Sequence, residues 1–343
     1  MNILTETIQG ICNPDADSAR QATDHWNTRA KLPGSLGLLE QAVTRLAAIQ
    51  RTGKPRLDKK AAVVLCADNG VVAEAITPSD PSVTAAQAVN FARGGGTINA
   101  FCRKCSAQVH VVDVGIATRY EEPRVDKRLI RPGTGNIACG PAMTKAECIH
   151  AICTGIQLAQ EAANDGIQLL ITGEMGIGNT TTSSAVASVL LDMPAEHITA
   201  RGAGAPERVE HKAAVIRKAI SLNRPDRSDP VDILAKVGGL DMAAMCGLYI
   251  GCASSGIAVM IDGIISSAAA LCAARLAPAA SAYMFASHRS AEPAADYLLE
   301  ALGLSPLITA NMCLGEGTGG ALAAVLFDCA LDAYYDVIAI DEI

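Results

Sequence analysis

The fold of this chain is indicated most directly by one segment, Gln168-Leu169-Leu170-Ile171-Thr172-Gly173-Glu174-Met175-Gly176-Ile177-Gly178-Asn179-Thr180-Thr181. It opens with a short apolar run, which is the pattern of a strand buried on both faces of a sheet. A glycine-rich loop with one carboxylate follows, and a helical stretch over 181–191 begins where the loop ends. This strand–loop–helix order is typical of one unit of a parallel α/β sheet.

Other short apolar runs also end in polar or glycine-bearing turns, as buried strands do. They cover residues 62–67, 109–114, 257–261 and 282–286. Helical stretches separate them, and the main ones are 84–100, 145–165, 206–222 and 262–276. The alternation predicts an α/β fold with a doubly wound, mainly parallel, Rossmann-like sheet over residues 60–290.

The two ends of the chain have a different pattern. Residues 1–59 and 291–343 are mostly helical in character, with one weak strand candidate near Ile308. We expect these ends to form a smaller helical domain together. The uncharged segment 242–261 is about as long as a bilayer span, but three glycines interrupt it. It is predicted to be a buried helix followed by a buried strand.

Composition limits the class of protein. Half of the 343 residues are apolar but only 3% are aromatic, so small aliphatic side chains must fill the core. The net charge is −7 with scattered Lys and Arg, which argues against a nucleic-acid surface. Most of the twelve cysteines lie in apolar runs, and the N-terminus lacks the pattern of an export signal. We therefore expect reduced thiols and a cytoplasmic protein.

A second glycine-rich loop also carries a single acid. Leu314-Gly315-Glu316-Gly317-Thr318-Gly319-Gly320 leads into an apolar helical tract over 321–330. Glycine lets backbone approach a ligand closely, and an acid beside a helix N-terminus is well placed for proton transfer. The alternative is that Glu316 only caps the helix. The spacing matches G-x-G-x-x-G, but its place near the end of the chain is wrong for a dinucleotide site.

The loop of the first segment suits a phosphate. Residues 176–181 offer backbone amides and two hydroxyls where a helix begins. A simple cap by Asn179 or Thr180 is the plainer interpretation and is compatible with that role. Cys102 and Cys105 form a C-x-x-C without two further ligands at suitable spacing, so we expect no metal site. Among the six histidines, only His288 stands in a loop of interest, and it can serve simply to hold that loop.

With these loops in place, the chain resembles the nicotinate-nucleotide:dimethylbenzimidazole phosphoribosyltransferase family over nearly its whole length. Residues 31–40, Lys-Leu-Pro-Gly-Ser-Leu-Gly-Leu-Leu-Glu, are similar to the KPxGSLGxLE opening of that family. Further matches follow in the family's order, and they lie at 67–71, 90–95, 113–115, 133–136, 173–181, 238–245, 262–263, 287–293 and 315–320.

The resemblance implies a reaction and a set of site residues. The family transfers the phosphoribosyl group of nicotinate mononucleotide to a lower-ligand base of cobamides, such as dimethylbenzimidazole, with inversion, and releases nicotinate. It implies Glu316 as general base, Glu174 as a second catalytic acid near the ribose or nicotinate, and no metal or cofactor. The residues it assigns to substrate binding are Ser79, Gln87, Gly176, Gly178, Asn179, Thr180, Lys212, Ser290, Gly315 and Gly317.

Within that set, Ser79 and Gln87 belong to the stretch that lines the base pocket. The loop 176–181, Lys212 and Ser290 would hold the phosphoribosyl part. For Lys212, a solvated charge on a helix surface is the alternative.

The chain departs from the family pattern around the base pocket. It has Asp68-Asn69-Gly70 where the family usually reads Asp-His-Gly, and Glu74-Ala75-Ile76-Thr77 where Glu-Gly-Val-Ser is usual. After Glu292-Pro293 the usual Gly-His pair is also missing. Substrate identity is therefore more open than reaction type.

Three alternatives follow. One is a phenol or p-cresol phosphoribosyltransferase subunit, which works as a heterodimer of two similar chains. Another is a partner subunit that binds ligand without turnover, although an intact Glu316 argues against it. A nicotinamide-dependent dehydrogenase is disfavoured, because no G-x-G-x-x-G follows the first strand. The family works as a dimer with its site near the subunit boundary, so we expect a homodimer or a heterodimer with a homologous chain.

Overall fold

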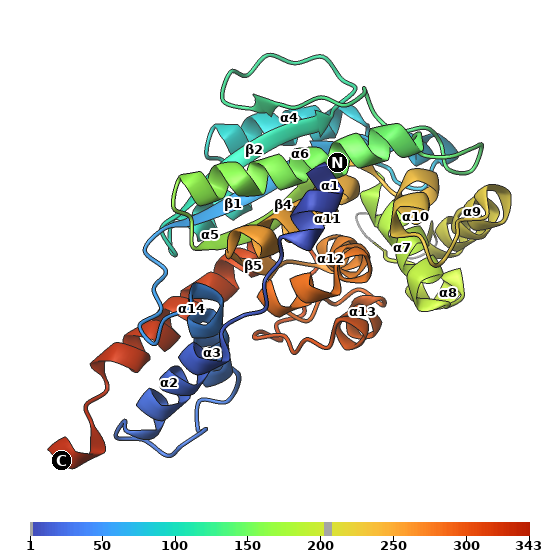
Figure 1. Cartoon of the computed structure of the whole chain (residues 1–343). Helices are drawn as coiled ribbons and strands as arrows, with labels where there is room; N and C mark the ends of the chain where they lie inside the picture. The colour runs from blue at the N-terminus through green and yellow to red at the C-terminus, as the bar shows by residue number, and fades with distance from the viewer. Residues whose placement is uncertain (1–2, 202–207) are drawn as a thin grey trace.

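A six-stranded parallel sheet between layers of helices forms the centre of the protein (Figure 1). A computed structural model describes residues 3–201 and 208–343. The strands lie in the order β3-β2-β1-β4-β5-β6, and every neighbouring pair is parallel. This confirms the predicted doubly wound α/β fold. The strands are β1 (Lys60–Ala67), β2 (Ala107–Gly115), β3 (Asp126–Lys127), β4 (Leu169–Met175), β5 (Ala258–Ile261) and β6 (Met284–Ala286).

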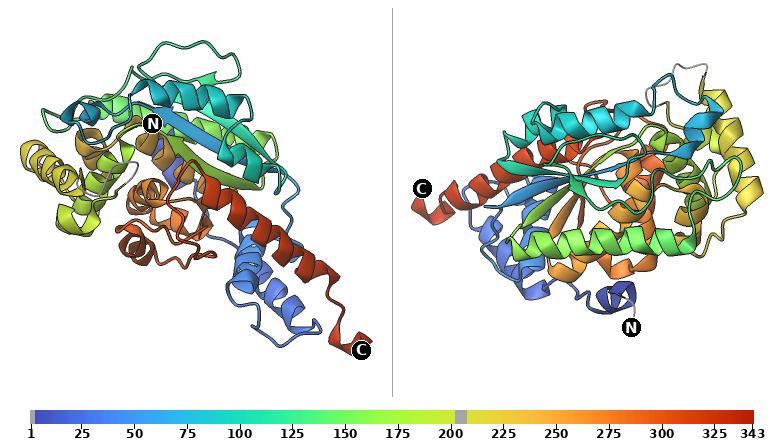
Figure 2. Two further views of the ribbon diagram at one scale, coloured as in Figure 1. Left: turned by 180° about the vertical axis from the view of Figure 1, so that it is seen from behind. Right: turned by 90° about the horizontal axis from the view of Figure 1, so that it is seen from above.

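Helices cover both faces of the sheet, as the view from above shows (Figure 2). On one face, α11 (Leu240–Ser255) lies against the strands and α6 (Lys145–Asn164) packs on α11. On the other face lie α4 (Ser82–Ala92), α5 (Thr97–Cys102) and α14 (Thr318–Asp336). The remaining helices are α1 (Ile3–Gln9), α2 (Ala16–Asn27), α3 (Leu38–Gln50), α7 (Asn179–Leu191), α8 (Ala195–Ile198), α9 (Arg208–Asn223), α10 (Pro230–Val237), α12 (Ile264–Leu276) and α13 (Ala295–Leu302). Three short 3₁₀ turns complete the described chain, and they are η1 (Gly70–Glu74), η2 (Pro278–Tyr283) and η3 (Ile340–Glu342).

Several local differences from the sequence-based expectation have clear causes. The helix expected over 84–100 is two helices, α4 and α5, because the glycines 94–96 interrupt it and Gly94 takes a φ of +82°. The loop expected at 173–176 begins later, since Glu174 and Met175 still pair with β1. Strand β3 was not predicted. Ile308 forms only an isolated bridge with His288. The helix expected over 206–222 is observed as α9, and the first two residues of that prediction lie outside the described residues.

Two glycines allow α6 and α11 to touch through their backbones. A Cβ atom on Gly155 would lie 1.8 Å from the carbonyl oxygen of Ala244, and one on Gly247 would lie 1.8 Å from that of Ile152. No real Cβ tolerates such a distance. The close pair of helices is therefore possible only because both positions lack a side chain.

We predict that Gly155→Ala destabilises the protein by about 3 kcal/mol, because the added methyl must push two packed helices apart. The free energy of unfolding from denaturant titration measures this. Gly140→Ala is a matched control, since a Cβ there meets nothing within 4 Å and its backbone has no positive φ. Equal unfolding midpoints for wild type and Gly155→Ala would contradict the helix contact.

At the protruding end of the molecule, the early helices α2 and α3 and the C-terminal part of α14 lie side by side (Figures 1 and 2). The Trp26 and Tyr334 rings meet edge to face with centroids 5.0 Å apart, and the Nε2 atom of His25 lies 2.7 Å from the Tyr334 carbonyl oxygen. Helix α1 instead packs on α6 and α11, and α13 packs on α12. A separate helical domain made of 1–59 and 291–343 stays a prediction.

The uncharged segment around 242–261 forms the buried helix α11 and the buried strand β5, as predicted. In the part of the chain that the structure describes, no helix is both long enough and apolar enough to cross a membrane. All twelve cysteines are free thiols, and the C-x-x-C pair Cys102 and Cys105 is buried.

Candidate active site

The candidate site lies at the carboxyl ends of β1 and β4, where the strand order reverses direction. Such a switch point leaves a crevice at the edge of an open parallel sheet, and ligands bind there. Asp68 and Asn69 follow β1 directly, and Glu174 stands near the end of β4. Asp241 at the start of α11 and Asp262 after β5 complete a group of buried acids.

Glu174 is 7% exposed and accepts two hydrogen bonds. Its Oε1 atom accepts from the backbone amide of Glu316 at 3.2 Å, and its Oε2 atom accepts from the side-chain amide of Asn179. Burial raises the pKa of Glu174 to about 8, and the nearby carboxylate of Asp241 acts in the same direction. The carboxyl group is therefore mostly protonated at neutral pH and can donate a hydrogen bond.

Asn179 links this acid to a second one. Its Nδ2 atom also donates to Asp241 at 3.2 Å, and burial raises the pKa of the Asp241 carboxyl to about 6. The expected cap of α7 by Asn179 or Thr180 is wrong. Gly178 is the N-cap, with a φ of +94° and no side-chain cap, so the Asn179 side chain is free to bind the acids.

Glu316 lies in a backbone conformation that is unusual for a residue with a side chain. Its φ is +64°, between Gly315 at +83° and Gly317 at +88°. A left-handed conformation costs about 1–3 kcal/mol outside glycine and persists only where neighbours hold it. The expected alternative, that Glu316 only caps α14, is wrong, because Gly317 is the N-cap and Asp262 binds the amides of the first turn.

The Glu316 carboxylate is half-buried and has no hydrogen-bond donor among residues 3–201 and 208–343. Burial raises the pKa of Glu316 to about 6, and the charge of Asp262 adds to the increase. At neutral pH the group is therefore mostly ionised and available to take a proton.

The loop that carries Glu316 passes directly over Glu174. A Cβ atom on Gly315 would lie 2.5 Å from the Oε1 atom of Glu174, and the φ of +83° also disfavours a side chain, so glycine suits this position. The fold thus brings together the two acids that the sequence suggested for catalysis. One carries a proton at neutral pH and the other does not, which is a usable pair for acid–base chemistry.

The residues expected to hold a phosphate meet at the start of α7. Lys212 is 1% exposed, so the alternative of a solvated helix charge is wrong. Its Nζ atom donates to the Thr180 hydroxyl at 3.4 Å and to the carbonyl oxygens of Ala200 and Arg201 at 3.4 and 2.8 Å. Burial lowers the pKa of Lys212.

Ser290 is linked to the segment at Arg201 through Glu292. The Ser290 hydroxyl accepts from the amide of Glu292 at 3.3 Å, and the Glu292 carboxylate accepts from the amide of Arg201 at 2.8 Å. The segment around Arg201 therefore connects Ser290 with Lys212. Lys212, the Thr180 hydroxyl and the N-terminus of α7 lie together and are groups that can bind an anion, and the Glu292 carboxylate stands beside them.

Ser79 lies just before α4, and Gln87 lies within that helix. The Thr84 hydroxyl accepts from the amide of Ile177 at 3.1 Å, which ties the start of α4 to the loop after β4. Ser79 stands in the turn before this helix, and Gln87 accepts from Asn90 at 3.0 Å. Both are half-buried, and within the described residues neither forms a hydrogen bond with Glu174 or Glu316. Their place in a base pocket stays a prediction.

Three polar residues of the site were assigned no catalytic or binding role from the sequence, although all three lie in or beside segments that match the family. Asp241 is the single charged residue in the apolar helix α11, which is a signal that sequence alone could have used. Asp262 directly follows a strand. Asn69 accepts from the Thr182 hydroxyl at 3.1 Å, and this contact could not be foreseen because the two residues lie far apart in the sequence.

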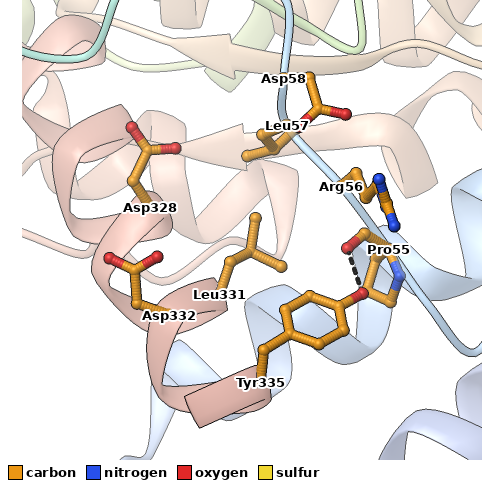
Figure 3. Close-up of a pocket in the computed structure, with 8 residues that line it drawn as sticks. All are labelled: Pro55, Arg56, Leu57, Asp58, Asp328, Leu331, Asp332 and Tyr335. Carbon is orange, nitrogen blue, oxygen red and sulfur yellow. Dashed lines mark hydrogen bonds between the residues drawn. The ribbon is translucent and has the colours of Figure 1, made fainter.

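A separate hollow lies at the other end of the strands. Its volume is about 330 Å³, and it is bounded by residues 55–58 before β1 and by Asp328, Leu331, Asp332 and Tyr335 of α14 (Figure 3). Since β1 begins there, the hollow lies at the amino-terminal ends of the strands, away from Glu174 and Glu316. The described residues contain no group of three or more His, Cys, Asp or Glu placed to hold a metal ion.

Together the fold and the site place a mostly protonated acid and a mostly ionised acid at the end of a parallel α/β sheet, with a buried lysine and a helix N-terminus in the same region. Residues 11–342 match the sequence model of a family described as Phosphoribosyltransferase. The chain therefore belongs to this phosphoribosyltransferase family and is a transferase, as the resemblance implied.

Individual relatives agree with this assignment. The nicotinate-nucleotide–dimethylbenzimidazole phosphoribosyltransferase of Acetivibrio thermocellus is 48% identical, over 97% of this chain and 95% of the relative. The enzyme of the same name from Desulforamulus reducens is 44% identical, over 96% and 95%. A crystal structure under that name from Thermus thermophilus superposes with a TM-score of 0.89 at 38% identity, covering 96% of this chain and 98% of the other.

Proposed function

We propose that this chain transfers the phosphoribosyl group of nicotinate mononucleotide to a cobamide lower-ligand base, dimethylbenzimidazole or a related azole. The products are an α-ribotide and nicotinate, with inversion at the anomeric carbon. The observation that carries the proposal is the ionised, donor-free Glu316 beside the protonated Glu174. The names of the relatives support the choice of substrates.

The residues divide the chemistry between them. A ring nitrogen of the base attacks the anomeric carbon while the bond to nicotinate breaks, and the bonding electrons return to the pyridine nitrogen. The attacking azole must lose its proton, and Glu316 is the group that accepts it. Protonated Glu174 donates a hydrogen bond near the ribose or nicotinate. Lys212, Thr180 and the α7 N-terminus balance the charge of the phosphate.

The test is a competition assay. Purified chain receives nicotinate mononucleotide with equal dimethylbenzimidazole and phenol, and the products are resolved by mass. An N-linked α-ribotide supports the proposal, whereas an O-linked product assigns the chain to the phenol or p-cresol branch. Product that forms only after a second homologous chain is added indicates an obligate heterodimer. No product under any combination contradicts the catalytic role of Glu316 and favours a ligand-binding subunit.

The proposal predicts a bell-shaped dependence of kcat/KM on pH. Activity should rise through pH about 6, as Glu316 loses its proton, and fall above pH about 8, as Glu174 loses its own. Initial rates at subsaturating nicotinate mononucleotide across this range measure both limbs. A rate that keeps rising above pH 8 would show that Glu174 does not act as a donor.

The protruding end supports a dimer. Most of the large apolar side chains that are exposed in the described residues gather there, and Leu32 is 78% exposed. The others at this end are Leu36, Leu38, Tyr335, Ile338, Ile340 and Ile343. A patch of this kind marks a protein interface. We propose a homodimer, or a heterodimer with a homologous chain, acting in the cytoplasm, where the free thiols would stay reduced.

A further inference from the structure

Asp262 makes the most concentrated set of backbone contacts in the site. It directly follows β5 and is 3% exposed. Its Oδ2 atom accepts from the amide of Gly317 at 2.9 Å, and its Oδ1 atom accepts from the amides of Gly319 and Gly320 at 2.7 and 3.1 Å. These amides belong to the residue after Glu316 and to the first turn of α14.

We propose that Asp262 is a positioning residue for Glu316. Asp262 holds the 315–320 loop so that the Glu316 carboxylate faces the substrates. The inference rests on the proposed function only in that Glu316 is taken as the proton acceptor. Asp262 itself does not touch the substrates in this scheme.

The first argument is geometric. Glu316 and Gly317 are consecutive, and their amides donate to two different buried carboxylates, Glu174 on β4 and Asp262 after β5. The peptide groups on both sides of the Glu316 side chain are therefore fixed to the rigid sheet. This is the support that a left-handed residue needs, because its conformation persists only where neighbours determine it.

The second argument concerns charge. Burial raises the pKa of Asp262, while the amides at the N-terminus of α14 and the nearby His288 act to lower it and so favour the carboxylate. The Nδ1 atom of His288 lies 3.9 Å from Asp262 and 2.9 Å from the Ser287 hydroxyl, so this histidine supports the acid from the β6 side. The other titratable groups that interact with Asp262 are Glu316, Glu174 and, from α11, Tyr249. The negative charge of Asp262 raises the pKa of Glu316.

Asp262→Asn tests both arguments. Asparagine keeps the shape but replaces one acceptor oxygen by a donor, so the loop loses part of its support. We expect kcat to fall by about 10–100-fold with little change in the KM for nicotinate mononucleotide. The acidic limb of the pH profile should also move to lower pH, because the charge that raises the pKa of Glu316 is gone. An acid that only stabilised the fold, away from Glu316, would not move that limb.

Asp229→Asn is the matched control. Asp229 also binds the first amides of a helix, those of Val231 and Asp232 in α10, but it lies outside the site. This variant should leave kcat and both pH limbs unchanged. An Asp262→Asn enzyme that retains the kcat and the acidic limb of wild type would overturn the proposal.

A second measurement needs neither substrate nor variant. In the wild-type protein, the amide protons of Gly317, Gly319 and Gly320 should exchange with solvent far more slowly than those of an exposed loop. Fast exchange at these three amides would overturn the proposal even if Asp262→Asn failed to fold. A wild-type enzyme that forms no ribotide but protects these amides would reject the proposed function and retain the loop contacts.

Discussion

Glu316→Gln should lower kcat by about 10²–10⁴-fold, with the KM for nicotinate mononucleotide nearly unchanged. Glutamine has the shape of glutamate but cannot take a proton from the attacking base. In the described residues no donor binds the Glu316 carboxylate, so the substitution breaks no internal hydrogen bond of that side chain. Steady-state kinetics with saturating base measure the two parameters separately.

The pH profile gives a second readout of the same variant. Because burial raises the pKa of Glu316 to about 6, the acidic limb of wild type should disappear in Glu316→Gln. Glu300→Gln, at an exposed position of α13, is the matched control and should behave as wild type. A Glu316→Gln enzyme with wild-type kcat and an intact acidic limb would rule out Glu316 as the base.

Lys212→Met should lower kcat/KM by about 10²–10³-fold, mainly through a higher KM for nicotinate mononucleotide. The Lys212 ammonium group is buried, and its hydrogen-bond partners are a hydroxyl and two carbonyl oxygens, which carry no formal charge. The charge of the Glu292 carboxylate also acts on Lys212 and raises its pKa, although burial lowers it more, so a phosphate would be the second anion beside this cation. Methionine keeps most of the length of the side chain and removes the charge.

The two variants separate chemistry from binding, because Glu316→Gln should lower kcat whereas Lys212→Met should mainly raise KM. Lys218→Met on the same helix is the control, because Lys218 is exposed and lies more than a turn away. Thermal unfolding of both lysine variants would show whether the loop at Ala200 and Arg201 still packs. An unchanged KM in a folded Lys212→Met enzyme would contradict the phosphate site.

Local pattern alone was enough to determine the class of fold. Buried strands are short apolar runs whatever their neighbours are, so β1, β2, β4 and β5 could be recognised from the sequence. The glycines around Glu316 and Glu174 also stand in the sequence, and they identify where backbone can come close to a ligand. The break between α4 and α5 was missed, although the glycines 94–96 that cause it were visible.

Only the tertiary structure decided how the site is assembled. Glu174 meets Glu316 because α14 packs against β4 and so brings the loop before α14 to the carboxyl end of that strand. The burial of Lys212 and the hydrogen bonds of Asp262 with the α14 amides likewise depend on segments that are far apart in the chain. Strand order and register arise from the packing of the whole core. Local sequence can therefore supply two carboxylates and the glycine-rich loops that carry them, while the raised pKa values and the contacts between the two acids come from the folded environment.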